Sequence, residues 1–224
     1  MAGVFCGVFL DYSRRPGRRA EVGRSSSSPR RTPPPRRLRA PEASKKIPRA
    51  MAAKIIPPSN FAVVQTDLYR SAQPTELNFP FLEKLNLRSV VHLAPDELPP
   101  PFLAWLDDQG IRLIHLGDDV GKRSPWKPVS EEMVLEGLSV LLDPASYPLL
   151  VMCTLGRHRT GTLVGCLRKL QGWNLTAILE EYRRHAGPKF RLLNEQFIEL
   201  FDTDLVPVPP RRPSWLLPAA VAAT

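Results

Sequence analysis

Short apolar runs alternate with longer amphipathic segments between residues 60 and 203. The short runs predict strands at residues 61–64, 68–69, 89–93, 111–116 and 149–152. Apolar positions at helical spacing predict helices at residues 80–85, 102–109, 131–142, 160–171, 174–185 and 192–201. Because strands and helices alternate, the sequence predicts an α/β fold with a mostly parallel central sheet flanked by helices.

Composition divides the chain of 224 residues, which is long enough for one packed domain with extensions. Residues 1–58 are rich in Pro, Arg and Ser and predict a disordered basic extension. We expect one domain over residues 59–204 and a Pro-rich tail over residues 205–224. The sequence contains no run of eighteen apolar residues, so it predicts no membrane-spanning helix.

The net charge of +9 is concentrated in the extension, where residues 1–50 hold 13 basic and 3 acidic residues. The rest of the chain is nearly neutral, with 18 basic and 19 acidic residues. This distribution argues against specific nucleic-acid binding by the domain. Three cysteines are too few for a disulfide framework and indicate a reducing compartment, which we predict to be the cytoplasm. The basic segment leaves a nuclear or organellar destination open.

The sequence from Cys153 to Gly161, CTLGRHRTG, joins an apolar strand to an amphipathic helix. Anions bind at the carboxyl ends of parallel strands and at helix N-termini. A free cysteine has a pKa of about 8.5, and a helix N-terminus with adjacent cationic side chains can lower such a value. The sequence therefore predicts a thiolate nucleophile at Cys153. The scattered histidines form no metal-ligand cluster, so we expect neither metal nor cofactor.

Each position of this loop has an expected role. The five residues between Cys153 and Arg159 allow the backbone to curl around a phosphoryl group, which the planar guanidinium then closes with two parallel hydrogen bonds. Gly156 relieves the tight curve, and Thr160 can donate a hydrogen bond to the sulfur. The other predicted substrate-binding residues are Thr154, Leu155, Gly156, Arg157, His158 and Lys122.

The Cys-x5-Arg spacing followed by Thr-Gly resembles the signature of the protein tyrosine phosphatase superfamily. Residues 60–203 are more specifically similar to the plant and fungal atypical dual-specificity phosphatases. The segments that carry this likeness are YRSAQP from Tyr69, GRHRTG from Gly156, GCLRKLQ from Gly165, EYRR from Glu181 and QFIELF from Gln196. The resemblance implies a dual-specificity-type fold, a phosphocysteine intermediate, and inositol pyrophosphates or phosphotyrosine proteins as substrates.

Two features qualify this resemblance. The family usually has His before the nucleophile, whereas this chain has Met152, which cannot hydrogen-bond the loop. A catalytically weak, phosphate-binding pseudophosphatase or scaffold is therefore the alternative. The superfamily also uses an Asp from another loop as general acid, and we predict Asp119 in preference to Asp118, although a solvated turn explains either residue equally well.

The tail contains Pro207-x-x-Pro210-x-Arg212, which matches a polyproline ligand of SH3 domains. Arg70 and Ser71 are placed to form a polar floor beneath the loop, and a turn hydrogen bond explains them equally well. Lys189 and Arg191 can reach the site or belong to a solvated helix end.

Overall fold

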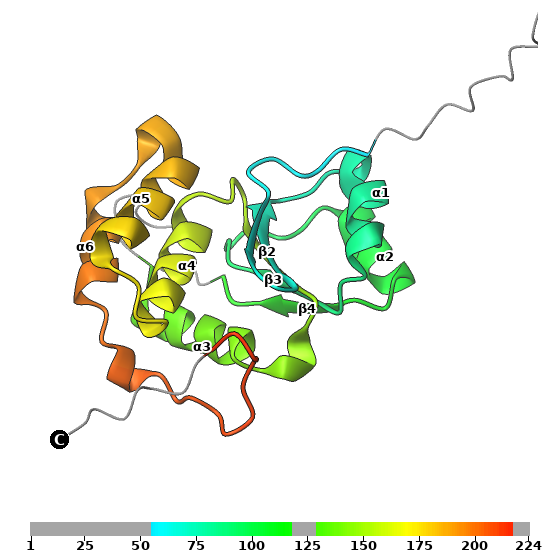
Figure 1. The fold of residues 1–224 in the computed structure, drawn as a ribbon. Helices are drawn as coiled ribbons and strands as arrows, with labels where there is room; N and C mark the ends of the chain where they lie inside the picture. The colour runs from blue at the N-terminus through cyan, green and yellow to red at the C-terminus, as the bar shows by residue number, and fades with distance from the viewer. Residues whose placement is uncertain (1–54, 118–128, 217–224) are drawn as a thin grey trace, which may run out of the picture. The chain divides into compact units, whose positions relative to one another are not determined.

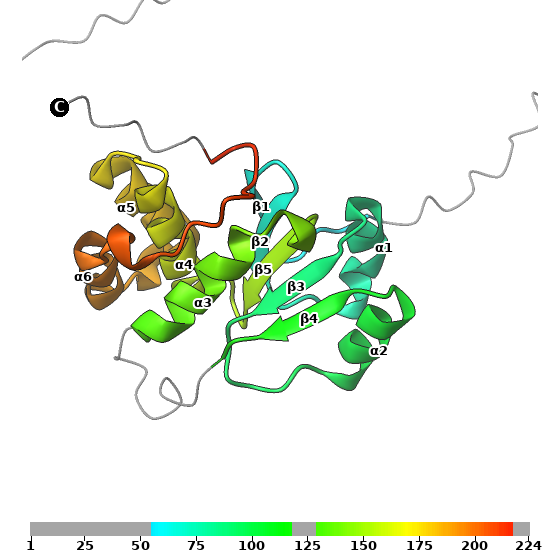
Figure 2. The ribbon, with the colours of Figure 1, turned by 90° about the horizontal axis from the view of Figure 1, so that it is seen from below.

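The structure is a computed structural model that describes residues 55–117 and 129–216. Its centre is a five-stranded sheet with the strand order β1-β2-β5-β3-β4, which Figure 2 shows from one side. The strands are β1 Ala62–Gln65, β2 Leu68–Ala72, β3 Ser89–His92, β4 Arg112–His115 and β5 Leu149–Cys153. The pair β1 and β2 is antiparallel and the other pairs are parallel, so the predicted sheet is confirmed.

Helices cover both faces of this sheet, as Figure 1 shows. On one face lie α1 Phe79–Leu82 and α2 Pro100–Asp108. On the other face lie α3 Glu131–Leu141, α4 His158–Leu170, α5 Leu175–Ala186 and α6 Leu192–Leu200. Short 3₁₀ turns at Glu76–Asn78 and Glu83–Leu85 flank α1.

Local sequence explains where the long helices begin and end. The Ser130 hydroxyl accepts a hydrogen bond from the Met133 N–H at 3.2 Å and caps α3. The Asn174 side chain accepts from the Thr176 N–H at 2.9 Å and caps α5 in the same way. Gly172, with a φ of 74°, takes the left-handed conformation that ends α4.

Two of the differences between predicted and observed bounds bear on the site. Strand β2 continues three residues beyond Tyr69, because Arg70 and the next two residues pair in parallel with β5. Because Arg70 and Ser71 are polar, the apolar pattern predicted that the strand ends at Tyr69, although the residues that follow are buried in β2. Helix α4 begins two residues before the predicted start, at His158, so the loop after Cys153 is shorter than the pattern indicated.

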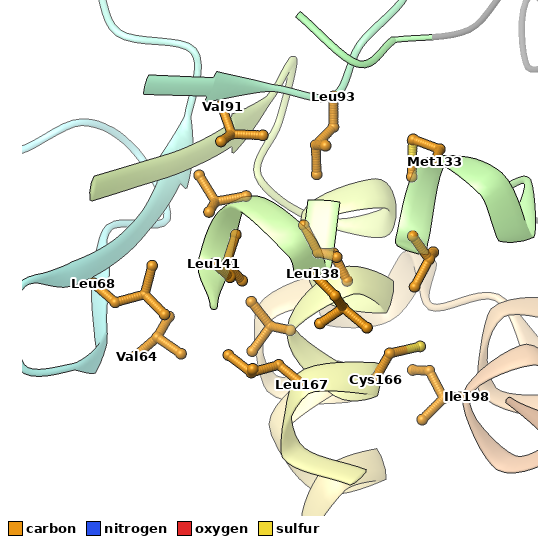
Figure 3. Close-up of a cluster of buried hydrophobic side chains, with 14 of the residues drawn as sticks. Val64, Leu68, Val91, Leu93, Met133, Leu138, Leu141, Cys166, Leu167 and Ile198 are labelled. Carbon is orange, nitrogen blue, oxygen red and sulfur yellow. The ribbon is translucent and has the colours of Figure 1, made fainter. Parts of the chain in front are cut away.

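The larger apolar cluster lies between the sheet and α3 to α6, and Figure 3 shows part of it. Its labelled side chains come from β1, β2, β3 and the residue after it, and from α3, α4 and α6: Val64, Leu68, Val91, Leu93, Met133, Leu138, Leu141, Cys166, Leu167 and Ile198. A second cluster under α1 and α2 includes Leu82, Val90, Phe102, Trp105, Leu150 and Met152. Strand β5 contributes to both clusters, so burial of its two faces fixes the position of Cys153 at its end.

The chain after α6 also packs against the larger cluster. Val206 and Leu216 are buried in it, and the Trp215 ring lies 6.4 Å from the Tyr147 ring between centroids. Residues 206–216 therefore contribute apolar contacts to the folded unit. Among residues 55–117 and 129–216, no helix is long and apolar enough to cross a membrane.

Packing of α4 against α6 depends on a small residue. A Cβ added at Gly165 would lie 2.6 Å from Ile198 Cδ1. We expect Gly165→Ala to lower the free energy of unfolding by about 1–3 kcal/mol, because it overpacks a filled core. Ile198→Val removes the clashing methyl group, so the double variant should recover part of that loss in urea unfolding. Additive losses would contradict this account of the interface.

Candidate active site

Cys153 is the last residue of β5, which lies between β2 and β3 in the middle of the sheet. The four residues 154–157 connect it to His158, the first residue of α4. The Cys153 side chain is 5% exposed, whereas Thr154 and Leu155 are exposed. The thiol therefore lies beneath an open loop, at the carboxyl end of a parallel strand and at the N-terminus of a helix.

The loop presses against β2 at Gly156. This residue has a φ of 64°, and a Cβ added to it would lie 2.5 Å from the Ala72 nitrogen and 2.5 Å from the Ser71 carbonyl carbon. A side chain would thus meet backbone that cannot move without breaking the sheet. The sequence-based role of Gly156 as the residue that permits the tight curve agrees with this geometry.

Two side chains hold the carbonyl of Gly156. Asn60 Nδ2 donates to it at 2.9 Å and Arg70 Nη2 donates to it at 3.1 Å. Asn60 precedes β1 in the chain, and Arg70 lies in β2. A trans peptide is planar, so the following N–H, that of Arg157, points away from these donors. The Gln73 N–H likewise donates to the Thr154 carbonyl at 3.4 Å, which directs the Leu155 N–H away from β2. These contacts orient amides as an anion-binding nest requires.

Arginines gather around His158. Burial, and after it the positive charges of Arg191, Arg157 and Arg159 in that order, together lower the pKa of His158 to about 4. His158 is therefore neutral at physiological pH, and its Nδ1 lies 3.4 Å from the Tyr182 hydroxyl. That hydroxyl accepts a hydrogen bond from the Arg191 N–H at 3.3 Å, which holds the residue before α6 beside the loop. The positive charges that act on His158 are thus those of guanidinium groups.

Thr160 lies in the first turn of α4 and is fully buried. Its hydroxyl makes no hydrogen bond with any residue that the structure describes. A buried hydroxyl without a partner is costly, so a ligand or an ionised sulfur is the expected acceptor. No group of three or more metal-binding side chains occurs within residues 55–117 and 129–216.

Residues 55–217, most of the chain, match the tyrosine phosphatase family. The chain belongs to the tyrosine phosphatase family. It is therefore a cysteine-dependent phosphatase, as the sequence predicts, and its similarity to inositol diphosphatases confirms the predicted branch of atypical dual-specificity enzymes.

Three relatives define this position. A probable tyrosine-protein phosphatase, DG1060 of Dictyostelium discoideum, is 62% identical over 161 residues, which are 72% of this chain and 96% of that protein. Inositol diphosphatase DSP3 of Arabidopsis thaliana is 46% identical over 148 residues, 66% of this chain and 72% of that protein. The crystal structure of the catalytic core of the PP-IP phosphatase SIW14 from S. cerevisiae, in complex with citrate, has a TM-score of 0.62 and 44% identity, covering 67% of this chain and 90% of that one.

Met152 does not face the loop in this family member. Cys153 belongs to the larger cluster beneath α4, whereas Met152 is fully buried in the cluster under α1 and α2, because successive residues of a strand face opposite sides. In the sheet register Met152 lies opposite His92. The methionine therefore fills an apolar layer on the face of β5 opposite to that of Cys153.

The structure brings together most of the predicted site residues and leaves others outside its description. Residues 153–160 form one continuous strand, loop and helix start. Asp119, Asp118 and Lys122 lie outside the described residues, so their roles stay predictions. Sequence reasoning missed Asn60, which has a left-handed φ of 56°. The available signal was an asparagine directly before the first apolar run, because Asn is enriched at left-handed positions.

A pocket of about 340 Å³ adjoins the loop at Thr154. Phe79 and Phe102 line it together with Pro99 and Pro101, and Glu76 is its acidic residue. The arginines around His158 make the other part of the site strongly cationic. The loop of this phosphatase therefore adjoins a pocket lined by aromatic and proline side chains as well as a group of arginines.

Two histidines make this phosphatase sensitive to acid. Burial lowers the pKa values of His158 and His185 to about 4, below the value of about 6.5 in an unfolded chain. Between these values the unfolded state binds more protons, so stability is lost as pH falls from about 6.5 to 4. We expect replacement of both histidines by Gln to reduce the slope of the unfolding free energy against pH in that window. The reduction should correspond to the loss of up to about two protons bound on unfolding. Urea unfolding at several pH values measures it, and an unchanged slope would contradict the assignment.

Proposed function

We propose that this phosphatase cleaves inositol pyrophosphates and aryl phosphates of the phosphotyrosine type through a phosphocysteine at Cys153. The observation that carries the proposal is the joint placement of the thiol and three guanidinium groups, from Arg157, Arg159 and Arg191, around one loop at a helix N-terminus. Such a site is suited to a tetrahedral oxyanion with several negative charges.

The first chemical step transfers the phosphoryl group to sulfur. The Cys153 thiolate attacks phosphorus, a P–S bond forms, and the bond from phosphorus to the leaving oxygen breaks. The electron pair of that bond remains on the leaving oxygen. The loop amides at Leu155 and Arg157, with the Arg159 guanidinium, bind the equatorial oxygens and stabilise their charge in the transition state.

The second step returns the enzyme to its starting state. Water attacks phosphorus, a new P–O bond forms as the water releases a proton to the solvent, and the P–S bond breaks. Orthophosphate leaves while the electron pair returns to sulfur. Thr160 is buried in the first turn of α4 with an unpartnered hydroxyl. That hydroxyl donates a hydrogen bond to the departing thiolate, which makes sulfur a better leaving group.

The leaving group decides how much a general acid contributes. A phenol has a pKa of about 10, whereas the second ionisation of a phosphate monoester has a pKa of about 6. A leaving phosphate therefore needs less protonation than a leaving phenolate. We assign the acid to Asp119, and we expect its contribution to be larger for aryl phosphates than for inositol pyrophosphates.

Charge favours inositol pyrophosphates as one substrate class. An inositol ring with several phosphates needs cations beyond the one that holds the scissile group. Arg157 follows the tight curve of the loop, and Arg191 is anchored beside it by its backbone hydrogen bond to Tyr182. The relative named an inositol diphosphatase supports the same choice. Lys122 and neutral His158 complete the proposed contacts to this substrate.

The pocket beside Thr154 favours the second class. Its aromatic and proline side chains suit a flat apolar ring, and Glu76 at the same place repels additional phosphates. A phosphotyrosine side chain combines one phosphoryl group with such a ring. The relative named a probable tyrosine-protein phosphatase agrees with this second candidate.

Compartment and further partners are also proposed. Cys153 and Cys166 are free thiols, which fits a reducing compartment, and we place the enzyme in the cytoplasm. The extension at residues 1–58 would redirect it if that segment is a targeting signal. Pro207 and Pro210 are exposed, so the SH3-type motif is accessible to a partner.

Steady-state kinetics with a diphosphoinositol polyphosphate and a phosphotyrosine peptide tests the proposal. We expect turnover of both substrates without added metal, inhibition by vanadate, and a loss of kcat by at least about a thousandfold in Cys153→Ser. Turnover of both substrates by Cys153→Ser at the rate of the native enzyme would refute the proposal.

The substrate preference has its own variant. Arg191→Gln removes one cation that a polyphosphate can contact, so we expect kcat/KM to fall about tenfold for the diphosphoinositol polyphosphate and little for the peptide. Arg183→Gln is the matched control, because this exposed arginine pairs with Glu195 instead. Equal losses of kcat/KM for both substrates in Arg191→Gln would contradict the argument that charge favours inositol pyrophosphates.

A further inference from the structure

Arg70 is a buried cation that the proposed reaction does not use. It lies in β2, is 1% exposed, and pairs in register with Val151 of β5, two residues before Cys153. Side chains two residues apart in a strand share a face, so Arg70 lies on the same face of the sheet as the nucleophile. A Cβ added at Gly161 would lie 3.6 Å from Arg70 Nη2, so the guanidinium lies beneath the first turns of α4.

The guanidinium has fewer partners than its burial demands. Its Nη2 donates to the Gly156 carbonyl, while Nε and Nη1 have no hydrogen-bond partner among the described residues. No ion pair within the described part of the chain includes Arg70. A buried charge without a counter-charge is strongly unfavourable, so a negative group that forms at this place in the active enzyme is expected.

The charged neighbours of Arg70 leave the thiol as that group. Burial lowers the pKa of Arg70 to about 10, and the negative charges of Glu181 and Cys153 oppose this effect while Arg168 adds to it. His185, from α5, is kept neutral by burial. Both Glu181 oxygens already accept from Arg168, at 2.8 and 3.3 Å. Among these groups, the ionised Cys153 is the anion not bound by another cation.

We propose that Arg70 is a positioning residue of the active site, whose buried guanidinium orients the Gly156 carbonyl and provides the counter-charge that favours ionised Cys153. It acts from below the loop, and Arg159 acts on the phosphoryl group. The proposal rests on the assignment of Cys153 as nucleophile made above. It adds to the site a residue of β2, which is far from Cys153 in sequence but next to β5 in the sheet.

Alkylation of the thiol isolates this effect from substrate turnover. Iodoacetamide reacts with thiolates, forming an S–C bond with loss of iodide, and mass spectrometry of the peptide that contains Cys153 follows this site separately from Cys6 and Cys166. In full-length Arg70→Met we expect the pH midpoint of the alkylation rate to rise by about one unit, which lowers the rate at acidic pH about tenfold. Arg70→Gln keeps a hydrogen-bond donor but loses the charge, and it should show the same shift.

Two control variants separate charge from structure. Asn60→Ala removes the other donor to the Gly156 carbonyl without changing charge, and Arg168→Met removes a buried arginine that binds Glu181. Arg168→Met should keep the native midpoint even if its melting temperature falls, whereas Asn60→Ala, which loses one of the two donors that orient the loop, should shift the midpoint less than Arg70→Gln does. A native midpoint in Arg70→Gln would overturn the proposal, and so would an equal shift in Asn60→Ala. If Cys153→Ser retained turnover while Arg70→Gln shifted the midpoint, the assignment of the nucleophile would fail and the charge coupling would stand.

Discussion

The orientation of one peptide group, that between Gly156 and Arg157, is the constraint on which the rest of the site depends. Its carbonyl is held by Asn60 and Arg70, and the absence of a side chain at Gly156 lets it approach β2. Once this carbonyl faces the sheet, the planar peptide must direct the next N–H toward the loop mouth. Apolar burial fixes the strand that ends at Cys153, and these polar contacts fix the curve that follows.

Charge in the site is arranged in two levels. The charges of Arg157, Arg159 and Arg191 act on His158 at the end of the loop, and Arg70 lies buried beneath the loop. The Glu181 carboxylate, whose charge acts on Arg70, is paired with Arg168 instead. A site with an excess of buried or half-buried positive charge costs stability in the absence of an anion, and it binds a phosphoryl group or a thiolate correspondingly more strongly.

Sequence predicted the part of this arrangement that is local. The apolar strand, the loop with Gly156 and the amphipathic helix are contiguous, so their periodicity and spacing identify them together. Asn60 could not be placed in this way, since its contact joins segments far apart in the chain, and for Arg191 the sequence left the site and a solvated helix end both open. For Arg70 the sequence left a polar floor beneath the loop and a turn hydrogen bond both open. Because Arg70 is polar, the pattern of apolar residues did not reveal that it belongs to the buried strand β2. The effect of Met152 also depended on tertiary structure, because its strand face decides what it contacts.

The central claim is that a covalent phosphocysteine forms at residue 153 within this loop. Rapid acid quenching of the enzyme during turnover of an aryl phosphate, followed by peptide mass spectrometry under conditions that preserve P–S bonds, measures it directly. The account predicts a phosphate-sized mass increase on the peptide containing Cys153, located on the sulfur and absent in Cys153→Ser. Phosphate release in a single turnover without any such adduct, or an adduct on another residue, would contradict it.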